Sequence, residues 1–102
     1  MEVITVTNEN FQELINREQI TVIDFWAPWC GPCMMMGPVL EEFANAHDDV
    51  TVGKVNVDEN GDLARQFRVM NIPTLAVFQN GELIKKEVGF HQLSELEAII
   101  AG

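Results

Sequence analysis

The sequence has few cysteines, few basic residues and no long apolar run. Two cysteines are too few to form a Cys₄ zinc site. Six basic against sixteen acidic residues give a formal net charge of −10, which argues against binding to nucleic acid or to an anionic membrane surface. No stretch is long and apolar enough to cross a bilayer. These absences favour a small globular protein, and 47% hydrophobic residues can supply its core.

The length and the first residues bear on domain number and location. With 102 residues, the chain is expected to form a single domain, 1–102, and to act as a monomer. Residues 1–6 run directly into a strand pattern, without the basic and apolar regions of a signal peptide. We therefore expect a cytoplasmic protein, in which a cysteine pair is more often catalytic than structural.

Both cysteines lie in one stretch, Trp29-Cys30-Gly31-Pro32-Cys33, between a predicted strand and a predicted helix. Residues 20–26 are mostly apolar, as is typical of a buried strand. The helix is predicted from residue 33 to about residue 47 by apolar residues at i, i+3, i+4 and i+7: Met36, Val39, Leu40 and Phe43. Cys30 should therefore lie at or just before the first helical turn, where Pro32 removes no helical hydrogen bond.

A helix start stabilises a thiolate, because its backbone N–H groups are unpaired and the positive end of the helix dipole lies there. We therefore expect the pKa of Cys30 to lie below that of a free thiol. Two intervening residues allow a disulfide between Cys30 and Cys33, with Cys30 facing solvent and Cys33 behind it. We predict thiol–disulfide exchange, in which Cys30 attacks and Cys33 resolves. The alternatives are a passive disulfide or half of a zinc site, although His47 and His91 lack metal-ligand spacing.

One carboxylate, Asp24, interrupts the apolar strand before the cysteines. Burial should raise its pKa, so that Asp24 can accept the proton of Cys33, directly or through a water. The alternative is a structural acid paired with Lys54 in the adjacent strand. For Lys54 itself two roles stay open: it tunes the pKa of Asp24, or it is simply solvated.

The remaining pattern alternates strands and helices and then ends with a hairpin and a helix. Further strands are predicted over residues 2–6, 51–57, 74–78 and 83–88, the last two joined at Asn80-Gly81. Further helices are predicted after the caps Thr7 or Asn8, after residues 58–62, and after a capping box at Ser94-x-x-Glu97. Parallel crossovers followed by a hairpin predict a mixed sheet covered by helices.

The combined motifs resemble those of thioredoxins. They are Asp24-Phe25-Trp26-Ala27, Trp29-Cys30-Gly31-Pro32-Cys33, Pro38, Lys54-Val55-Asn56-Val57-Asp58, Ile72-Pro73-Thr74-Leu75, Phe78-x-Asn80-Gly81 and Val88-Gly89. The resemblance implies an α/β thioredoxin fold, with a central five-stranded mixed sheet flanked by four helices. It also implies a general protein disulfide reductase that binds no cofactor, carries a redox-active Cys30–Cys33 disulfide, and is recharged by a flavin- and NADPH-dependent thioredoxin reductase.

The resemblance further implies where substrates bind. The Ile72–Pro73 bond would be cis and lie against the disulfide, with the Ile72 backbone pairing with an extended substrate segment. A trans proline that opens a strand is the alternative. An exposed Trp29 would add apolar contact beside Gly31-Pro32. Gly89 would leave room for a partner's backbone, or would merely end a strand.

Met34 departs from the family pattern, which usually has a basic residue directly after the second cysteine. We expect Met34 to be exposed. Without a cation there, the pKa of Cys30 should be modestly higher and acidic partners should be attracted less. The alternative is a neutral surface change.

Two other functions stay open at this point. Oxidases and isomerases resemble this fold, but they usually carry histidine where Pro32 stands and work in export compartments. A non-catalytic binding subunit would instead dock a partner on Trp29, Ile72 and Gly89 without any thiol exchange.

Overall fold

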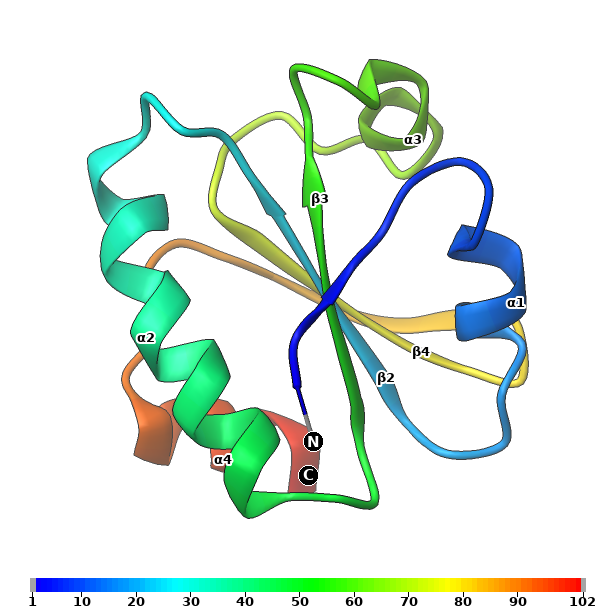
Figure 1. The fold of residues 1–102 in the computed structure, drawn as a ribbon, viewed down its shortest axis with the longest axis vertical. Coiled ribbons are helices and arrows are strands. Elements are labelled where there is room, and N and C mark those ends of the chain that lie inside the picture. Colours follow the sequence, from blue (N-terminus) through cyan, green and yellow to red (C-terminus); the bar gives the residue numbers. More distant parts are fainter. Residues whose placement is uncertain (1, 102) are drawn as a thin grey trace.

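The computed structural model describes residues 2–101, which build one five-stranded sheet with helices on both faces (Figure 1). The strands are β1 (Ile4–Thr5), β2 (Thr21–Trp26), β3 (Thr51–Asn56), β4 (Thr74–Gln79) and β5 (Glu82–Val88). The helices are α1 (Phe11–Ile15), α2 (Gly31–Ala46), α3 (Gly61–Gln66) and α4 (Leu93–Ala101). The predicted alternation of strands and helices, followed by a hairpin, is confirmed.

The strand order is β1-β3-β2-β4-β5. Strand β3 runs parallel to β1 and β2, whereas β4 runs antiparallel to both β2 and β5. The sheet is therefore mixed, as predicted. Strand β2 lies at its centre, which explains its nearly continuous apolar sequence, because a central strand is covered on both faces. Asp24 of β2 pairs with Lys54 of β3 on one side and with Leu75 of β4 on the other.

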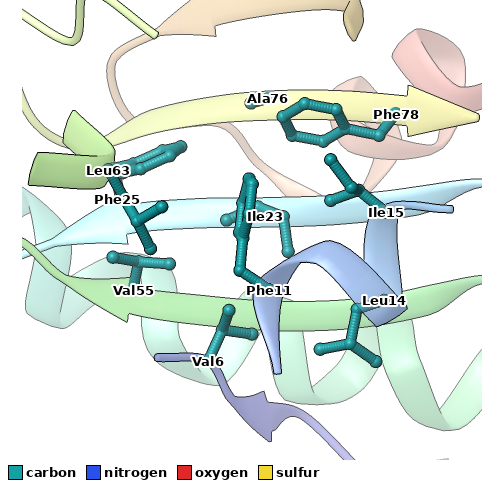
Figure 2. Packing of buried hydrophobic residues seen from close by; sticks show 10 residues of the cluster. All are labelled: Val6, Phe11, Leu14, Ile15, Ile23, Phe25, Val55, Leu63, Ala76 and Phe78. Atoms are coloured by element: carbon teal, nitrogen blue, oxygen red, sulfur yellow. The ribbon is translucent and has the colours of Figure 1, made fainter. Parts of the chain in front are cut away.

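Each face of the sheet has its own hydrophobic cluster. Helices α1 and α3 cover one face and α2 and α4 cover the other (Figure 1). Figure 2 shows the cluster on the α1 and α3 side, which includes Phe11, Phe25 and Phe78. On the opposite side, Met36, Leu40 and Phe43 of α2 pack with apolar residues of the sheet and of α4. Residues 2–101 contain no helix that is long and apolar enough to span a membrane.

The predicted helix starts differ from the structure by a few residues. Helix α3 begins at Gly61, inside the stretch 58–62 after which it was predicted, and its N-cap is Asn60. Helix α2 begins at Gly31 rather than Cys33, because Cys30 itself is the N-cap. Helix α1 is capped at Asn10 instead of Thr7 or Asn8.

The predicted capping box at Ser94-x-x-Glu97 is wrong. Helix α4 already begins at Leu93, so Ser94 lies within the first turn. Its start is instead closed by Gln92, whose backbone N–H donates to Glu95 Oε1 at 2.9 Å. The sequence places two acidic residues one turn downstream of possible caps, and the pattern alone cannot distinguish the two registers.

Candidate active site

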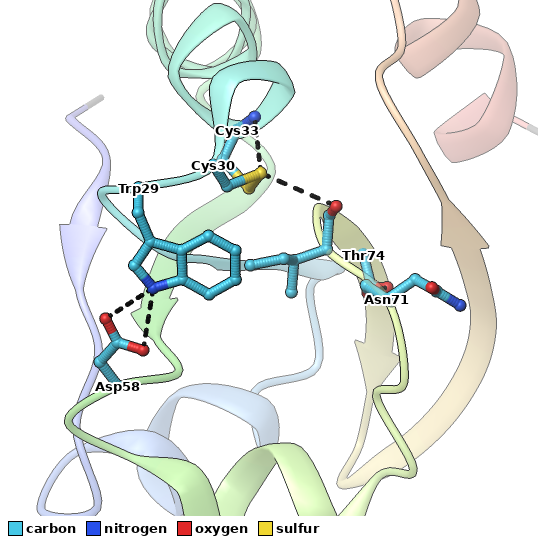
Figure 3. The surroundings of a disulfide bond; sticks show 7 residues. Trp29, Cys30, Cys33, Asp58, Asn71 and Thr74 are labelled. Carbon is cyan, nitrogen blue, oxygen red and sulfur yellow. Dashed lines mark hydrogen bonds between the residues drawn. A yellow bond between two sulfur atoms is a disulfide. The ribbon is translucent and has the colours of Figure 1, made fainter.

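Cys30 and Cys33 form a disulfide where the chain passes from β2 into α2 (Figure 3). Cys30 is the N-cap residue of α2, with an extended backbone (φ −95°, ψ 112°). Its Sγ accepts a hydrogen bond from the backbone N–H of Cys33 at 3.2 Å, as an N-cap oxygen does in other helices. Negative charge that develops on this sulfur is therefore stabilised by an N–H group and by the helix dipole.

The two sulfur-bearing residues differ little in exposure. Cys30 is 7% exposed and Cys33 is 3% exposed, so Cys30 is the outer residue, as predicted, but it does not face solvent openly. The reason is that Ala27 is buried beside the disulfide and Ile72 packs against the same cluster. A partner must therefore come into close contact with the surface to reach the Cys30 sulfur.

Trp29 is 70% exposed, which confirms the predicted exposed indole beside the disulfide. Its Nε1–H donates to both carboxylate oxygens of Asp58, at 3.0 and 3.3 Å (Figure 3). The contact between Trp29 and Asp58 was not predicted from the sequence. The signal was available, since Asp58 follows β3 as Trp29 follows β2, and the ends of parallel neighbours meet at one edge of a sheet.

The loop before β4 lies directly against the disulfide. The Ile72–Pro73 peptide bond is cis, as the resemblance implies. The Ile72 carbonyl oxygen lies 3.8 Å from Cys30 Sγ, a contact that a dashed line from the Cys30 sulfur marks in Figure 3. Pro73 is buried, and its carbonyl accepts a hydrogen bond from the Gly89 N–H at 2.8 Å. Gly89 has a φ of +100°, a conformation that favours glycine, and a Cβ added there would meet no atom within 4 Å. Both predictions for Gly89 fit this geometry, because it directly follows the end of β5 at Val88 and also leaves open space for a partner.

Asp24 lies on the inner side of the disulfide. It is 2% exposed, and burial raises its pKa to about 7, while the positive charge of Lys54 acts in the opposite direction. The predicted rise in pKa is confirmed. Oδ1 of Asp24 has no hydrogen-bond partner among residues 2–101. A cavity of about 80 Å³ is lined by Asp24, Trp26, Cys33, Met34, Gly37 and Lys54. Asp24 and Cys33 therefore share one small cavity.

Lys54 does not pair with Asp24 directly. The ion pairs in the described part of the chain are Arg17–Glu13 and His47–Glu97, so Lys54 acts on Asp24 through its charge without an ion pair at contact distance. Instead, the Lys54 ammonium lies over the indole of Trp26, with Nζ 5.1 Å from the ring centroid. Trp26 itself is half-buried and packs against the disulfide cluster.

The side chains of the two histidines form hydrogen bonds with residues other than the cysteines. His47 Nε2 pairs with Glu97 at 2.7 Å, and His91 Nδ1 contacts the Gly89 carbonyl at 2.8 Å. Across residues 2–101, no three side chains of the His, Cys, Asp and Glu types gather in a way that could hold a metal ion.

Replacing Asp24 with asparagine should stabilise the oxidised protein at neutral and alkaline pH. Folding raises the pKa of Asp24 from 3.8 to about 7, so the ionised form destabilises the fold. This cost is absent below pH 3.8, grows as the pH rises towards 7, and then stays constant at about 4 kcal/mol. Denaturant unfolding across pH 3 to 9 should show the Asp24→Asn gain growing over that window. Glu9→Gln, on the surface, is the control, and a gain that does not vary with pH would contradict the assignment.

Known proteins are similar to this chain in sequence and in fold. The thioredoxin family model matches residues 2–102. A thioredoxin of Alicyclobacillus acidocaldarius subsp. acidocaldarius is 52% identical over 99 residues, which cover 96% of this chain and 94% of that protein. The crystal structure of Malassezia sympodialis thioredoxin matches with a TM-score of 0.90 at 38% identity, covering 98% of this chain and 89% of that chain.

A larger relative joins two activities in one chain. A bifunctional thioredoxin reductase/thioredoxin of Mycobacterium leprae is 44% identical over 88 residues, which cover 84% of this chain and 19% of that protein. Together with the disulfide at the start of α2, these matches identify both the family and its chemistry. The chain belongs to the thioredoxin family and is a protein disulfide oxidoreductase that works through Cys30 and Cys33.

Proposed function

We propose that the protein is a general disulfide reductase in which Cys30 is the nucleophile and Cys33 the resolving thiol. The observation that carries this proposal is the hydrogen bond from the Cys33 N–H to Cys30 Sγ at the helix start. In the reduced protein, the same N–H group would stabilise a Cys30 thiolate. That thiolate attacks one sulfur of a substrate disulfide, forms a mixed disulfide, and releases the other substrate sulfur as a thiolate that takes a proton from solvent.

The second step needs a base for Cys33, and we assign that role to Asp24. Both residues line the same cavity, which is large enough for a bridging water. The Asp24 carboxylate accepts the Cys33 proton as Cys33 attacks Cys30 Sγ. The Cys30–Cys33 bond forms, the bond from Cys30 to the substrate breaks, and the substrate leaves as a thiolate. A base with a pKa of about 7 suits this transfer at neutral pH.

Substrates would bind around the exposed edge of the disulfide. Trp29, Gly31 and Pro32, which adjoin the cysteines in the sequence, are all exposed. Ile72 lies next to Cys30, Pro73 is hydrogen-bonded to Gly89, and Gly89 leaves open space. An extended segment could pair with the Ile72 backbone there and bring its own disulfide to the Cys30 sulfur.

We further propose a cytoplasmic protein that acts as a monomeric single domain and is recharged by a flavin- and NADPH-dependent thioredoxin reductase. The Mycobacterium leprae relative, in which the two activities are fused, supports this pairing. No bound cofactor is needed, because both electrons are carried by the two cysteines. A strongly reducing potential of the Cys30–Cys33 couple would favour this function, and an oxidising one would favour an oxidase or isomerase.

Single cysteine variants should separate the two thiol roles. Cys33→Ser should accumulate a mixed disulfide between Cys30 and a substrate such as insulin, because the resolving thiol is missing. Cys30→Ser should neither trap nor reduce the substrate. Intact-protein mass spectrometry measures the adduct, and insulin turbidity measures reduction. If Cys30→Ser trapped the substrate and Cys33→Ser did not, the assignment would be contradicted. If the double variant Cys30→Ser/Cys33→Ser still reduced insulin, the thiols would not be used.

Met34 and Met35 offer a matched pair for testing the effect of charge beside the site. Both are exposed, as was predicted for Met34, but Met34 also lines the cavity shared by Asp24 and Cys33. Met34→Lys should lower the pKa of Cys30 by a few tenths of a pH unit, because a cation stabilises the thiolate. Met35→Lys should have a smaller effect. Titrating the thiolate absorbance of the reduced protein checks both, and an unchanged or raised pKa in Met34→Lys would refute the idea.

A further inference from the structure

Lys54 lies where it can reach either of two groups. Its Cα pairs with that of Asp24 across β2 and β3, and both side chains line the cavity next to Cys33. The ammonium nevertheless lies over the Trp26 ring, and Asp24 forms no ion pair among residues 2–101. A desolvated cation is attracted to the face of an indole more strongly than to any other aromatic ring. The ring and the carboxylate therefore compete for one cation.

Other charged groups near Lys54 do not replace this contact. Lys54 also lines two neighbouring cavities, one of which carries Glu59 and the other Glu41. The second of these cavities is also lined by Glu2. All three carboxylates belong to exposed residues, unlike the buried Asp24, and none of them forms an ion pair with Lys54 in the described chain. Among the described residues that line the cavity of Asp24, Lys54 is its titratable neighbour in the oxidised protein, because Cys33 is held in the disulfide. The distance of the Lys54 ammonium from the carboxylate is thus the main electrostatic influence on the pKa of Asp24 besides burial.

We propose that Trp26 is a positioning residue that holds the Lys54 ammonium on its ring face and so keeps it out of contact with the Asp24 carboxylate. The inference rests on the proposed role of Asp24 as the base for Cys33. With a lysine in direct contact, Asp24 would stay ionised at lower pH and would be a weaker base for a thiol. With the lysine on the ring, Asp24 keeps a pKa closer to that of the proton it must accept.

A double-mutant cycle tests this inference directly. Trp26→Leu removes the ring face and should lower the pKa of Asp24 by about one pH unit when Lys54 is present, because an opposite charge at contact distance has an effect of that size. Trp26→Phe keeps a weaker ring and should give a smaller decrease. The pKa is measured from the carboxyl ¹³C shift of Asp24 in the oxidised protein, so the readout does not depend on activity.

The Lys54→Met background supplies the control. Loss of the Trp26 ring also admits water to the cavity, and this effect on the pKa of Asp24 is the same with or without a lysine. The inference therefore requires a larger decrease with Lys54 than with methionine at that position. Equal decreases in the two backgrounds would overturn it and leave Trp26 as a packing residue only. If Trp26→Leu does not fold, the Trp26→Phe cycle decides in the same way.

The wild-type protein gives a second, independent readout. A lysine over an indole face has its ε-protons shifted upfield by the ring current, so the Lys54 Hε resonances should lie upfield of those of Lys86. Lys86 is a suitable reference because its Nζ contacts backbone carbonyls of Phe67 and Arg68. Equal shifts for the two lysines would overturn the inference. If instead the cycle shows the coupling but Asp24→Asn leaves the Cys33 step unchanged, the base role fails and the placement of Lys54 stands.

Discussion

One hydrogen bond, from the Cys33 N–H to Cys30 Sγ, determines the chemistry of this site. It makes a sulfur the N-cap of α2, so the group that caps the helix is also the group that must carry negative charge. The rest of the local structure follows from this requirement. The C-terminal end of strand β2 leads the chain to the start of α2. The loop with the cis Ile72–Pro73 bond lies against the same sulfur.

The buried acid on the inner side of the site, Asp24, lowers the free energy of unfolding. A carboxylate with 2% exposure and no partner for Oδ1 among residues 2–101 costs folding free energy whenever it is ionised. The sheet tolerates this cost because both of its faces carry apolar clusters, one of which is shown in Figure 2. Such a placement is understandable where the acid serves a reaction, since burial moves its pKa to about 7.

Much of this arrangement could be predicted from the sequence. The apolar run of β2 and the 3.6-residue period after Cys33 located the strand-to-helix turn, and burial of Asp24 within that run predicted its raised pKa. Two predictions were wrong where neighbouring side chains decide the local structure. The start of α4 was misplaced because Glu95 and Glu97 offer two cap registers, and Cys30 proved less exposed than expected because Ile72 packs beside it. Long-range contacts such as Trp29 with Asp58 leave only a weak signal in a single sequence.

The central claim is that Cys30 is held as a thiolate by the start of α2, and the pH dependence of alkylation tests it most directly. The reduced protein is treated with iodoacetamide from pH 5 to 10, and the modified cysteine is identified by peptide mass spectrometry. We predict that Cys30 reacts first, with an apparent pKa below the value of about 8.5 for a free thiol. Reaction of Cys33 ahead of Cys30, or of neither faster than an ordinary thiol at neutral pH, would contradict the account.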